Sequence, residues 1–315
     1  MHIGIYGLGS IARRHIRNIS KVLCERGEDF QIDVFRHEGR MIEDRDIKTI
    51  VSNVYSTDQI YDRHYDIVFI TNPTAKHYET IRKCIPYTKH MFIEKPVFDR
   101  YDKDIAGLHL KQGSVYYVAC PLRYTSVIQY LKMNVKPEDV ISVRAISSSY
   151  LPEWRPGIDY RKTYSAHKSL GGGVAIDLIH EWDYLIHLFG MPQKVLYAGG
   201  KYSNLDIDSD DLAVYVGLYN NRIIELHLDY FGRKTMRELL VYTADDTIHA
   251  DLMDGKITYL KTGKVIESDE TRDDYQCKEI EHFLAIIDGE IDNDSSIQHA
   301  ADVLKIAESY GEYMS

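Results

Sequence analysis

The first third of the chain alternates short apolar runs with segments of helical character. The apolar runs that predict strands are residues 3–6, 32–35, 66–71, 90–93 and 115–119. A helix is expected at 11–22, where apolar residues recur every four positions, and another at 76–85, after a proline that ends the preceding strand. Strand–helix alternation of this kind favours a parallel sheet covered by helices.

From about residue 121 the pattern changes. The strand-like segments there are residues 140–150, 194–198, 212–218, 222–228, 238–243, 247–251 and 257–259. Helices are expected at 174–189, 275–288 and 296–310. Short turns between successive strands predict a largely antiparallel sheet. We therefore expect two domains: an α/β domain over 1–120 and an α+β domain over 121–315.

A glycine-rich turn follows the first predicted strand and opens the first predicted helix. Its spacing, Gly7, Gly9 and Ala12 with Ser10 and Ile11 between them, is that of a dinucleotide fingerprint. The first glycine permits the tight turn, the second lets the backbone approach a pyrophosphate, and the alanine allows close packing of helix on strand. The alternative is a structural turn in an unrelated α/β fold.

The end of the second predicted strand bears on the choice of dinucleotide. An acidic residue there would favour NAD, but the chain has Arg36. A guanidinium suits a 2′-phosphate, so we favour NADP(H) over NAD(H). In the alternative, Arg36 stacks on adenine or faces solvent, and Asp33 or Glu38 binds the ribose.

Two further groups of residues carry candidate chemistry. Lys95 lies between Glu94 and Pro96 at the end of a predicted strand, which suits either a salt bridge or a reactive amine. On the predicted helix 174–189, Asp177 and His180 are spaced to share one face, and histidine is the natural proton carrier near neutral pH. No further ligand at a suitable spacing supports a metal site there, so none is expected.

Composition narrows the function classes. The 315 residues carry a formal net charge of −10, which disfavours nucleic acid or an anionic membrane as partner. No apolar stretch has the length of a membrane span, and the N-terminus lacks the pattern of a signal peptide, so we expect a cytoplasmic protein. The four cysteines form no Cys-x-x-Cys pair, which argues against structural disulfides and a zinc site.

Together these motifs resemble the glucose–fructose oxidoreductase and inositol dehydrogenase family (Gfo/Idh/MocA). The resemblance rests on the order of four segments: residues 7–12, 71–77, 94–96 and 171–177. It implies an N-terminal Rossmann domain and a C-terminal domain with an open, mainly antiparallel sheet. It also implies a homodimer or homotetramer joined through that sheet, and an enzyme that oxidises or reduces a sugar, inositol or nucleotide sugar with NAD(H) or NADP(H).

The resemblance also assigns roles to residues. Lys95 matches the lysine beside the nicotinamide, and Asp177 matches the acidic residue of the substrate site. The further residues expected at the cofactor are Asn72, Pro73, His77 and Glu94, and those expected at the substrate are Arg123, Tyr160, Arg161, Tyr164 and Glu181.

One position departs from the family pattern. Many members place the catalytic histidine four residues after the aspartate, where this chain has Glu181; His180 comes one residue earlier. His180, Glu181 and a tyrosine, Tyr164 first, all stay open as the proton carrier. The segment 177–185 and the residues around 154–161 are similar to a subgroup associated with bacterial surface-carbohydrate genes.

The predicted activity is hydride transfer between nicotinamide and a carbinol carbon of a sugar, with Lys95, Asp177 and His180 as catalytic residues. Two alternatives remain: a non-catalytic dinucleotide sensor of the same fold, and an enzyme that cleaves or epimerises a glycoside through transient oxidation. The sequence names neither the sugar nor the carbon.

Overall fold

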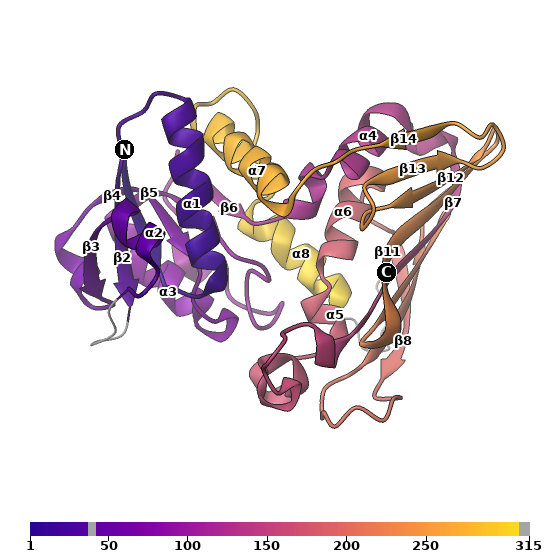
Figure 1. Ribbon diagram of the computed structural model, residues 1–315, viewed down its shortest axis with the longest axis horizontal. Coiled ribbons are helices and arrows are strands. Elements are labelled where there is room, and N and C mark those ends of the chain that lie inside the picture. The colour runs from indigo at the N-terminus through magenta and orange to yellow at the C-terminus, as the bar shows by residue number, and fades with distance from the viewer. Residues whose placement is uncertain (37–41, 309–315) are drawn as a thin grey trace. The chain divides into compact units, whose positions relative to one another are not determined.

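The computed structural model describes residues 1–36 and 42–308. The chain divides into two compact units, which are described in turn (Figure 1). Unit 1 comprises residues 1–121 and 271–302, and unit 2 comprises residues 122–270 and the chain from 303 onward. Glu38, one of the alternatives for the ribose, lies outside the described residues.

Unit 1 is built on a six-stranded sheet in the order β3-β2-β1-β4-β5-β6, and all of its pairings are parallel. Its strands are β1 (His2–Tyr6), β2 (Gln31–Arg36), β3 (Val51–Ser56), β4 (Tyr65–Ile70), β5 (Thr88–Ile93) and β6 (Tyr116–Val118). Its helices are α1 (Ser10–Glu25), α2 (Arg45–Ile50), α3 (His77–Cys84) and α7 (Arg272–Ile287). This strand order is that of the doubly wound dinucleotide-binding fold.

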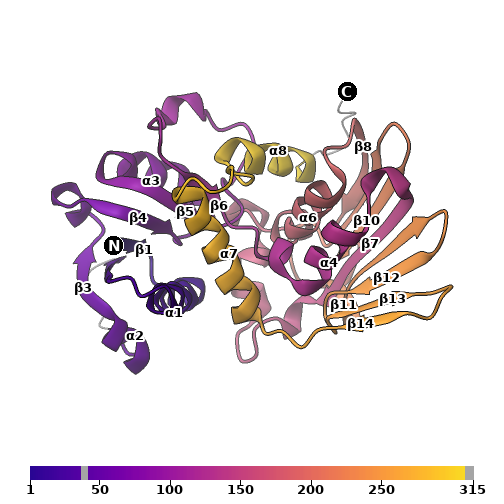
Figure 2. The ribbon, with the colours of Figure 1, turned by 90° about the horizontal axis from the view of Figure 1, so that it is seen from above.

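Buried aromatic rings join helix α7 to the sheet of unit 1. The ring of Phe283 on α7 lies 5.4 Å from that of Phe92 on β5 and 6.5 Å from that of Phe69 on β4, and all three side chains are fully buried. Helix α7 also packs beside α1 (Figures 1 and 2). Because aromatic side chains contribute large apolar areas to a core, this cluster explains why a distant segment of the chain belongs to unit 1.

Unit 2 contains an eight-stranded sheet in the order β14-β13-β12-β11-β7-β10-β9-β8. Its strands are β7 (Val140–Tyr150), β8 (Lys194–Gly200), β9 (Leu212–Leu218), β10 (Ile223–Asp229), β11 (Phe231–Thr243), β12 (Thr247–Asp251), β13 (Lys256–Tyr259) and β14 (Val265–Glu267). Its helices are α4 (Ser126–Asn134), α5 (Val174–Asp177) and α6 (His180–Phe189), and α8 (Ile297–Ala307) crosses the boundary between the units. The β7–β10 pair is parallel and the others are antiparallel.

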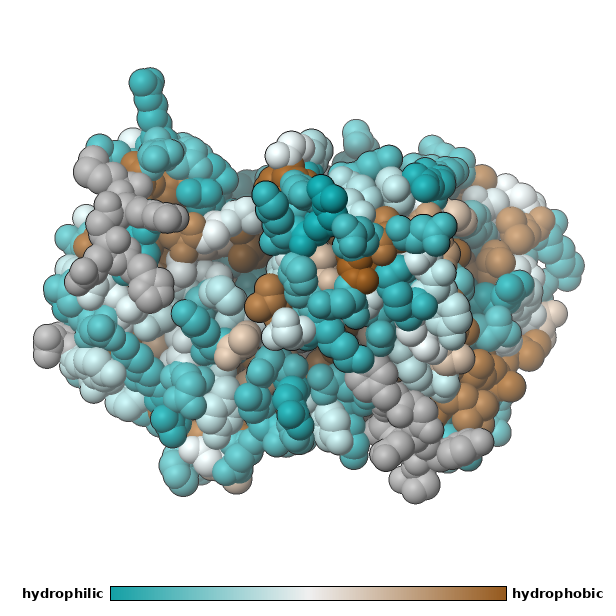
Figure 3. Space-filling view, turned by 90° about the horizontal axis from the view of Figure 1, so that it is seen from below, coloured by the Kyte–Doolittle hydropathy of each residue, from teal (hydrophilic) through white to brown (hydrophobic). Residues whose placement is uncertain are grey.

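The two faces of the unit 2 sheet differ. Helices α4 and α6 cover one face (Figure 2), where Trp182 of α6 and Tyr215 of β9 are fully buried with their rings 5.5 Å apart. The opposite face carries side chains of alternate residues that stay partly or fully exposed, such as Leu196 and Ile223. Figure 3 shows hydrophobic residues gathered on the right-hand side, where this sheet lies.

Short 3-10 turns occupy many of the connections. They are Gln59–Asp62, Thr74–Lys76, Ile85–Tyr87, Ala106–Leu108, Pro121–Tyr124, Pro137–Asp139, Leu151–Glu153, Tyr160–Lys162, Tyr164–Ala166 and Lys168–Leu170. Four of these turns lie in the long connection between β7 and α5. In the described ranges, no helix is long and apolar enough to cross a membrane.

The fold class is as predicted: a parallel Rossmann sheet and a mainly antiparallel second sheet. The expected helix 174–189 is wrong as a single helix, because it is interrupted at Leu178, whose backbone leaves the helical region. The sequence reading also missed α2, β3, α4 and β14, which are short, and the first part of β11, where an irregular register interrupts the strand pattern.

The observed division of the chain also differs from the expected one. Residues 271–302 were assigned to the second domain, but they belong to unit 1. The aromatic cluster around Phe283 is the physical reason. A contact between segments about 200 positions apart leaves no local signal in the sequence.

Candidate functional site

The turn after β1 lies at the point where the order of strands reverses. Strands β2 and β4 flank β1 on either side, and in open α/β sheets ligands bind at this position, outside the carboxyl ends of the strands. Gly7 follows β1 with φ of +104°, and a Cβ there would come within 3.0 Å of the backbone nitrogen of Asn72, which follows β4. A side chain is therefore excluded at residue 7 by both backbone conformation and space.

The residues after Gly7 form the start of helix α1. Gly9 is its N-cap, Ser10 is its first residue, and Ala12 is fully buried against the sheet, whereas Ile11 is partly exposed. A Cβ built on Gly9 would meet no described atom within 4 Å. This open approach to the N-terminus of a sixteen-residue helix fits a pyrophosphate, whose charge the helix dipole and free backbone N–H groups favour.

Asn72 contributes a second feature that fits a dinucleotide. Its Nδ2 donates to Thr80 Oγ1 at 2.7 Å, while its Oδ1 is buried and has no hydrogen-bond partner among the described residues. A buried acceptor without a donor is costly, so this oxygen suits a ligand hydroxyl. Pro73 follows and caps the 3-10 turn at Thr74–Lys76.

His77 is fully buried and joins the segments that follow β4 and β5. Its Nε2 lies 2.9 Å from the carbonyl oxygen of Asn72, and its Nδ1 lies 3.1 Å and 3.2 Å from those of Pro96 and Val97. Burial lowers the pKa of His77 despite these carbonyl contacts, which favours the neutral ring. Both ring nitrogens of His77, a residue expected at the cofactor, thus face backbone carbonyls on either side of the turn that carries Lys95.

Glu94 and Lys95 follow β5, the strand next to β4. The Glu94 side chain is only 14 % exposed, and its Oε1 lies 2.5 Å from Nε2 of His15, which is buried on α1. Burial raises the pKa of Glu94, but its hydrogen bond with His15 and the nearby Lys95 ammonium lower it overall. The carboxylate is therefore held in its charged form beside the partly exposed Lys95.

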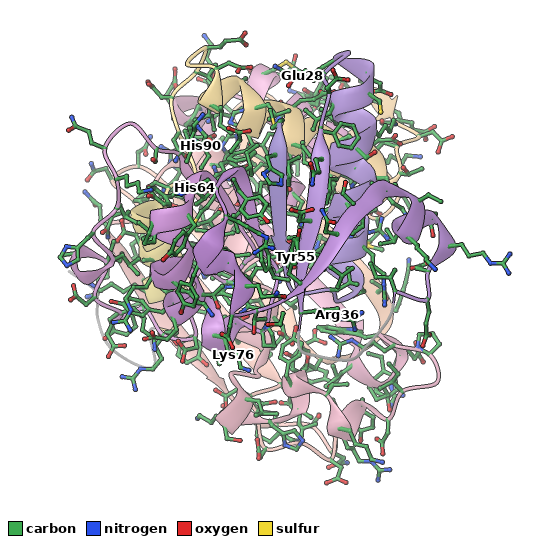
Figure 4. The ribbon with its side chains drawn as sticks, turned by 90° about the vertical axis from the view of Figure 1, so that its left-hand side faces the viewer. Glu28, Arg36, Tyr55, His64, Lys76 and His90 are labelled. Carbon is green, nitrogen blue, oxygen red and sulfur yellow. The ribbon has the colours of Figure 1, made fainter. Side chains whose placement is uncertain are left out.

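Arg36 ends β2, and Figure 4 shows it at the same end of the sheet as Lys76, opposite to Glu28 and His90. This is the carboxyl end of the strands, as binding of an adenosine ribose requires. Asp33, the acidic alternative, is fully buried and accepts hydrogen bonds from His2, Asn53, Tyr65 and Gln31. Its oxygens are thus engaged inside unit 1.

In unit 2, Asp177 is the centre of a cluster of hydroxyl groups. Tyr230, fully buried, donates from its hydroxyl to Asp177 Oδ2 at 2.6 Å. The Tyr164 hydroxyl also faces the Asp177 side chain closely enough for that carboxylate to raise the tyrosine pKa. Burial and the Asp177 charge raise the pKa of both tyrosines, so both stay protonated and act as donors near neutral pH.

A glycine allows the loop to reach this cluster. A Cβ at Gly172 would come within 2.2 Å of the Tyr164 carbonyl oxygen and within 2.7 Å of that of Ser165. Only a residue without a side chain permits so close an approach of two backbones. The run of three glycines before α5 is therefore explained in part by the packing of the loop that carries Tyr164.

The other predicted residues of α6 have different surroundings. His180 is the first residue of α6 and is partly exposed. Glu181 is fully buried, and its Oε1 accepts from Arg237 Nε on β11 at 2.7 Å. Glu181 thus anchors α6 to the sheet through Oε1, whereas its Oε2 is buried without a hydrogen-bond partner among the described residues.

Arg123 is also buried in an internal ion pair. Its guanidinium donates to both carboxylate oxygens of Asp183 on α6, at 2.8 Å and 2.6 Å. A bidentate buried pair is a strong structural contact, and its removal from the interior would leave an uncompensated charge. We therefore leave Arg123 and Glu181 out of the site proposed below.

The long loop brings two more predicted residues to the surface of unit 2. Arg161 donates to both oxygens of Asp159 at 2.9 Å, and Asp206 lies 3.7 Å away. Tyr160 accepts from the backbone N–H of Asp206 at 3.2 Å. The loop also lines a small, partly open pocket. The residues that line it are Leu151, Trp154, Arg155, Ile158, Tyr160, Thr163 and Ser165.

The sequence reading missed His15 and Tyr230 as members of these clusters. His15 lies one turn beyond Ala12 on α1, so a polar residue on the buried face of that helix was the available signal. Tyr230 lies in the tight connection between β10 and β11 and carried no comparable signal, because its contact with Asp177 spans 53 positions.

Comparisons with known proteins agree with this geometry. Residues 1–118 match the model of an oxidoreductase family with an NAD-binding Rossmann fold. The chain is 26 % identical over 204 residues to YrbE, an uncharacterized oxidoreductase of Bacillus subtilis; the match covers 62 % of this chain and 56 % of YrbE. It is 25 % identical over 205 residues to the myo-inositol 2-dehydrogenase of Thermotoga maritima, covering 64 % of this chain and 58 % of that protein.

The matches therefore span a little over half the length of these curated relatives. Among solved structures, a levoglucosan dehydrogenase in complex with NADH and levoglucosan superposes with a TM-score of 0.84. That match has 15 % identity and covers 98 % of this chain and 95 % of the other. At this identity the likeness concerns the fold, which extends over both units.

Proposed function

Because residues 1–118 match the Gfo/Idh/MocA oxidoreductase family, we propose that the chain transfers a hydride between a nicotinamide dinucleotide and a carbinol carbon of a sugar, inositol or nucleotide sugar. The observation that carries the proposal is the set of residues at the carboxyl ends of the central strands of the unit 1 sheet. There the Gly7–Gly9 turn, Asn72 and Glu94–Lys95 follow the neighbouring strands β1, β4 and β5. Relatives and structural neighbours that are sugar or inositol dehydrogenases support it.

In this proposal the dinucleotide is held by unit 1. The backbone at Gly9 and Ser10 binds the pyrophosphate, Asn72 offers its buried acceptor, and Arg36 binds the 2′-phosphate that distinguishes NADP from NAD. When bound, the nicotinamide supplies or accepts the hydride. NADP(H) is the proposed cofactor because of Arg36 and because Asp33 is engaged internally.

The side chains of the protein manage the proton and the developing charge. Lys95 donates a hydrogen bond to the reacting oxygen and stabilises negative charge that forms there. His180 takes or gives the hydroxyl proton. Asp177, fixed by Tyr230, orients the substrate, and Tyr164, kept protonated by its raised pKa, serves as a hydrogen-bond donor rather than a base.

The proposal includes a second copy of the chain. The exposed face of the unit 2 sheet carries Leu196 and Ile223, which are 38 % and 46 % exposed, and we assign this face to a homodimer or homotetramer of a cytoplasmic enzyme. Sedimentation of the protein should then give two or four times the mass of the chain. Substitution of Ile223 by Lys should shift that mass toward the monomer.

The activity is tested by absorbance of the reduced nicotinamide. The protein is mixed with NADP⁺ or NAD⁺ and a panel of hexoses, inositols and nucleotide sugars, and the reverse reaction is run with the reduced cofactor and keto sugars. Net reduction with at least one substrate supports a dehydrogenase. Tight cofactor binding without net turnover by any compound would reject it and leave the sensor or the transient-oxidation enzyme.

A further inference from the structure

Most arginines of unit 2 have an acidic or carbonyl partner. The pairs are Arg123 with Asp183, Arg144 with Glu225, Arg161 with Asp159, Arg222 with the carbonyl of Pro137, and Arg237 with Glu181. Arg155 and Arg233 differ from these. Both are exposed, and in the described part of the chain neither has a carboxylate within ion-pair distance.

Each of these two arginines lies over a tyrosine ring instead. The Cζ atom of Arg155 is 5.3 Å from the ring centroid of Tyr164, and that of Arg233 is 3.8 Å from the ring centroid of Tyr150. An arginine stacked on a ring has lost much of its freedom of movement, while its N–H groups still point outward along the edge of the guanidinium. Such an arginine is preorganised to receive a planar or tetrahedral anion.

The two tyrosines belong to the surroundings of Asp177. Tyr164, under Arg155, lies near the Asp177 carboxylate, whose charge raises the pKa of the tyrosine. Tyr150, under Arg233, precedes Leu151, whose backbone N–H donates to the Tyr230 carbonyl at 2.9 Å. Tyr230 in turn donates to Asp177.

A second contact joins the loop to the same tyrosine. The Trp154 ring lies edge-on to that of Tyr230, at 5.2 Å between centroids, and Trp154 is the neighbour of Arg155 in the chain. Arg155 therefore lies over a tyrosine that faces Asp177, and Arg233 lies over a tyrosine whose chain neighbour is hydrogen-bonded to the backbone of Tyr230.

Charge makes this arrangement informative. The protein has a formal net charge of −10, so carboxylates are plentiful, and most unit 2 arginines have found one. A cation–π contact at an exposed site is worth only about 0.5–1 kcal/mol. Stacking alone thus gives weak reason to keep these two arginines without a carboxylate partner on the tyrosines near the Asp177 network, whereas an acidic ligand would use both.

We propose that Arg155 and Arg233 bind an acidic group of the substrate, so that the sugar carries a carboxylate or a phosphate. This inference rests on the proposed function, because it takes Asp177 to mark the substrate site. It narrows the substrate class from sugars in general to anionic sugars.

The test compares neutral and acidic sugars that share a ring. Binding to the full-length protein, saturated with NADPH, is measured by calorimetry for glucose, glucuronate and glucose 6-phosphate. A second set is N-acetylglucosamine and UDP-N-acetylglucosamine. We expect at least one acidic probe to bind about tenfold or more tightly than its neutral counterpart, with a preference that falls as salt is added. Glucuronate and glucose 6-phosphate separate a carboxylate from a phosphate.

Variants assign the preference to the two arginines. In the Arg155→Ala/Arg233→Ala double variant the ratio of acidic to neutral affinity should fall to about one, and the matching lysine variants should keep part of it because charge remains without the planar fork. The Lys136→Ala/Lys256→Ala variant removes the same charge from exposed positions of unit 2 and should keep the full ratio. Thermal melting confirms that each variant folds.

Equal binding of neutral and acidic probes, no binding of any acidic probe, or an unchanged preference in the double variant would each overturn the inference. Failure of the proposed function has a different signature. In that case acidic sugars would bind through the two arginines but give no change in reduced-nicotinamide absorbance with any member of the panel.

Discussion

In unit 1, the candidate residues follow the ends of adjacent parallel strands, and the contacts that hold them are buried. His15 holds Glu94, and His77 holds the backbone on both sides of the site. In unit 2, the candidate groups come from a long loop, a short helix and a strand connection that meet only through side chains, with Asp177 and Tyr230 at the centre. The first region is built by backbone topology, and the second by contacts distant in sequence.

This difference indicates a division of labour between the units. Nicotinamide dinucleotides share one structure and require one binding geometry, which the carboxyl ends of the strands in a rigid sheet supply. Substrates differ among relatives, and loops tolerate the changes that such variety requires. If so, substitutions at the site of unit 1 should lower the rate of hydride transfer or change the preference between NADP(H) and NAD(H). Substitutions at the site of unit 2 should change which substrate is used.

The largest expected effect is that of Lys95→Ala. Loss of the amine that stabilises charge on the reacting oxygen should lower kcat by about two orders of magnitude or more, while NADP(H) still binds. Stopped-flow absorbance gives the rate, and cofactor fluorescence gives the affinity. Lys89→Ala is the matched control, because Lys89 lies on β5, the strand that precedes Lys95, and is exposed and paired with Asp66. Near-normal turnover of the Lys95 variant would remove this residue from the chemistry.

The same contrast explains how much could be read from the sequence. The turn at Gly7–Ala12 and the pair Glu94–Lys95 are local motifs, and their strand context was predicted correctly. The break at Leu178 was missed because the apolar pattern of 174–189 continues through it.

Long-range contacts account for what the sequence could not show. The ion pairs of Arg123 with Asp183 and of Glu181 with Arg237 join residues about 60 positions apart, and such a pair has no local signature. The same holds for the position of α7, which depends on Phe283.

Asp177→Asn tests the centre of the second region. The amide keeps the shape but removes the charge that both tyrosine hydroxyls face, so we expect kcat/KM for the best substrate to fall about tenfold or more. Cofactor affinity should not change, in contrast to the effect expected for substitution of Arg36 in unit 1. Asp254→Asn, in an exposed turn of unit 2, is the control. A loss of cofactor binding equal to the loss of kcat/KM would break the proposed division between the units.

Arg36→Ala tests cofactor choice in the first region. Loss of a guanidinium that pairs with the 2′-phosphate should weaken NADP(H) binding about tenfold and leave NAD(H) binding within about twofold. Fluorescence titration with both reduced cofactors measures the ratio. Arg82→Ala, which removes an exposed arginine paired with Glu79 on α3, should leave that ratio unchanged. Equal losses for the two cofactors would show that Arg36 does not read the 2′-phosphate.

Glu94→Gln gives the smallest expected effect and tests whether unit 1 uses burial to hold its site. The folded-state pKa of Glu94 is lowered from its ordinary value of 4.5, so folding favours the carboxylate. The stability that this carboxylate contributes is therefore present above pH 4.5 and is lost as the pH falls through the folded-state pKa. The wild type should exceed the variant by about 1–2 kcal/mol in free energy of unfolding at pH 7.

Urea unfolding of both proteins between pH 7 and pH 3 measures this difference, which should shrink steadily below pH 4.5 because the protonated acid and the amide then make similar contacts. Glu79→Gln removes an exposed carboxylate paired with Arg82 and should change stability by less than about 0.5 kcal/mol over the same range. A constant difference between wild type and Glu94→Gln at all pH values would mean that the His15–Glu94 contact does not depend on charge. In that case His15 would support Glu94 through packing and a neutral hydrogen bond, and the charge of Glu94 would play no part in holding the site of unit 1.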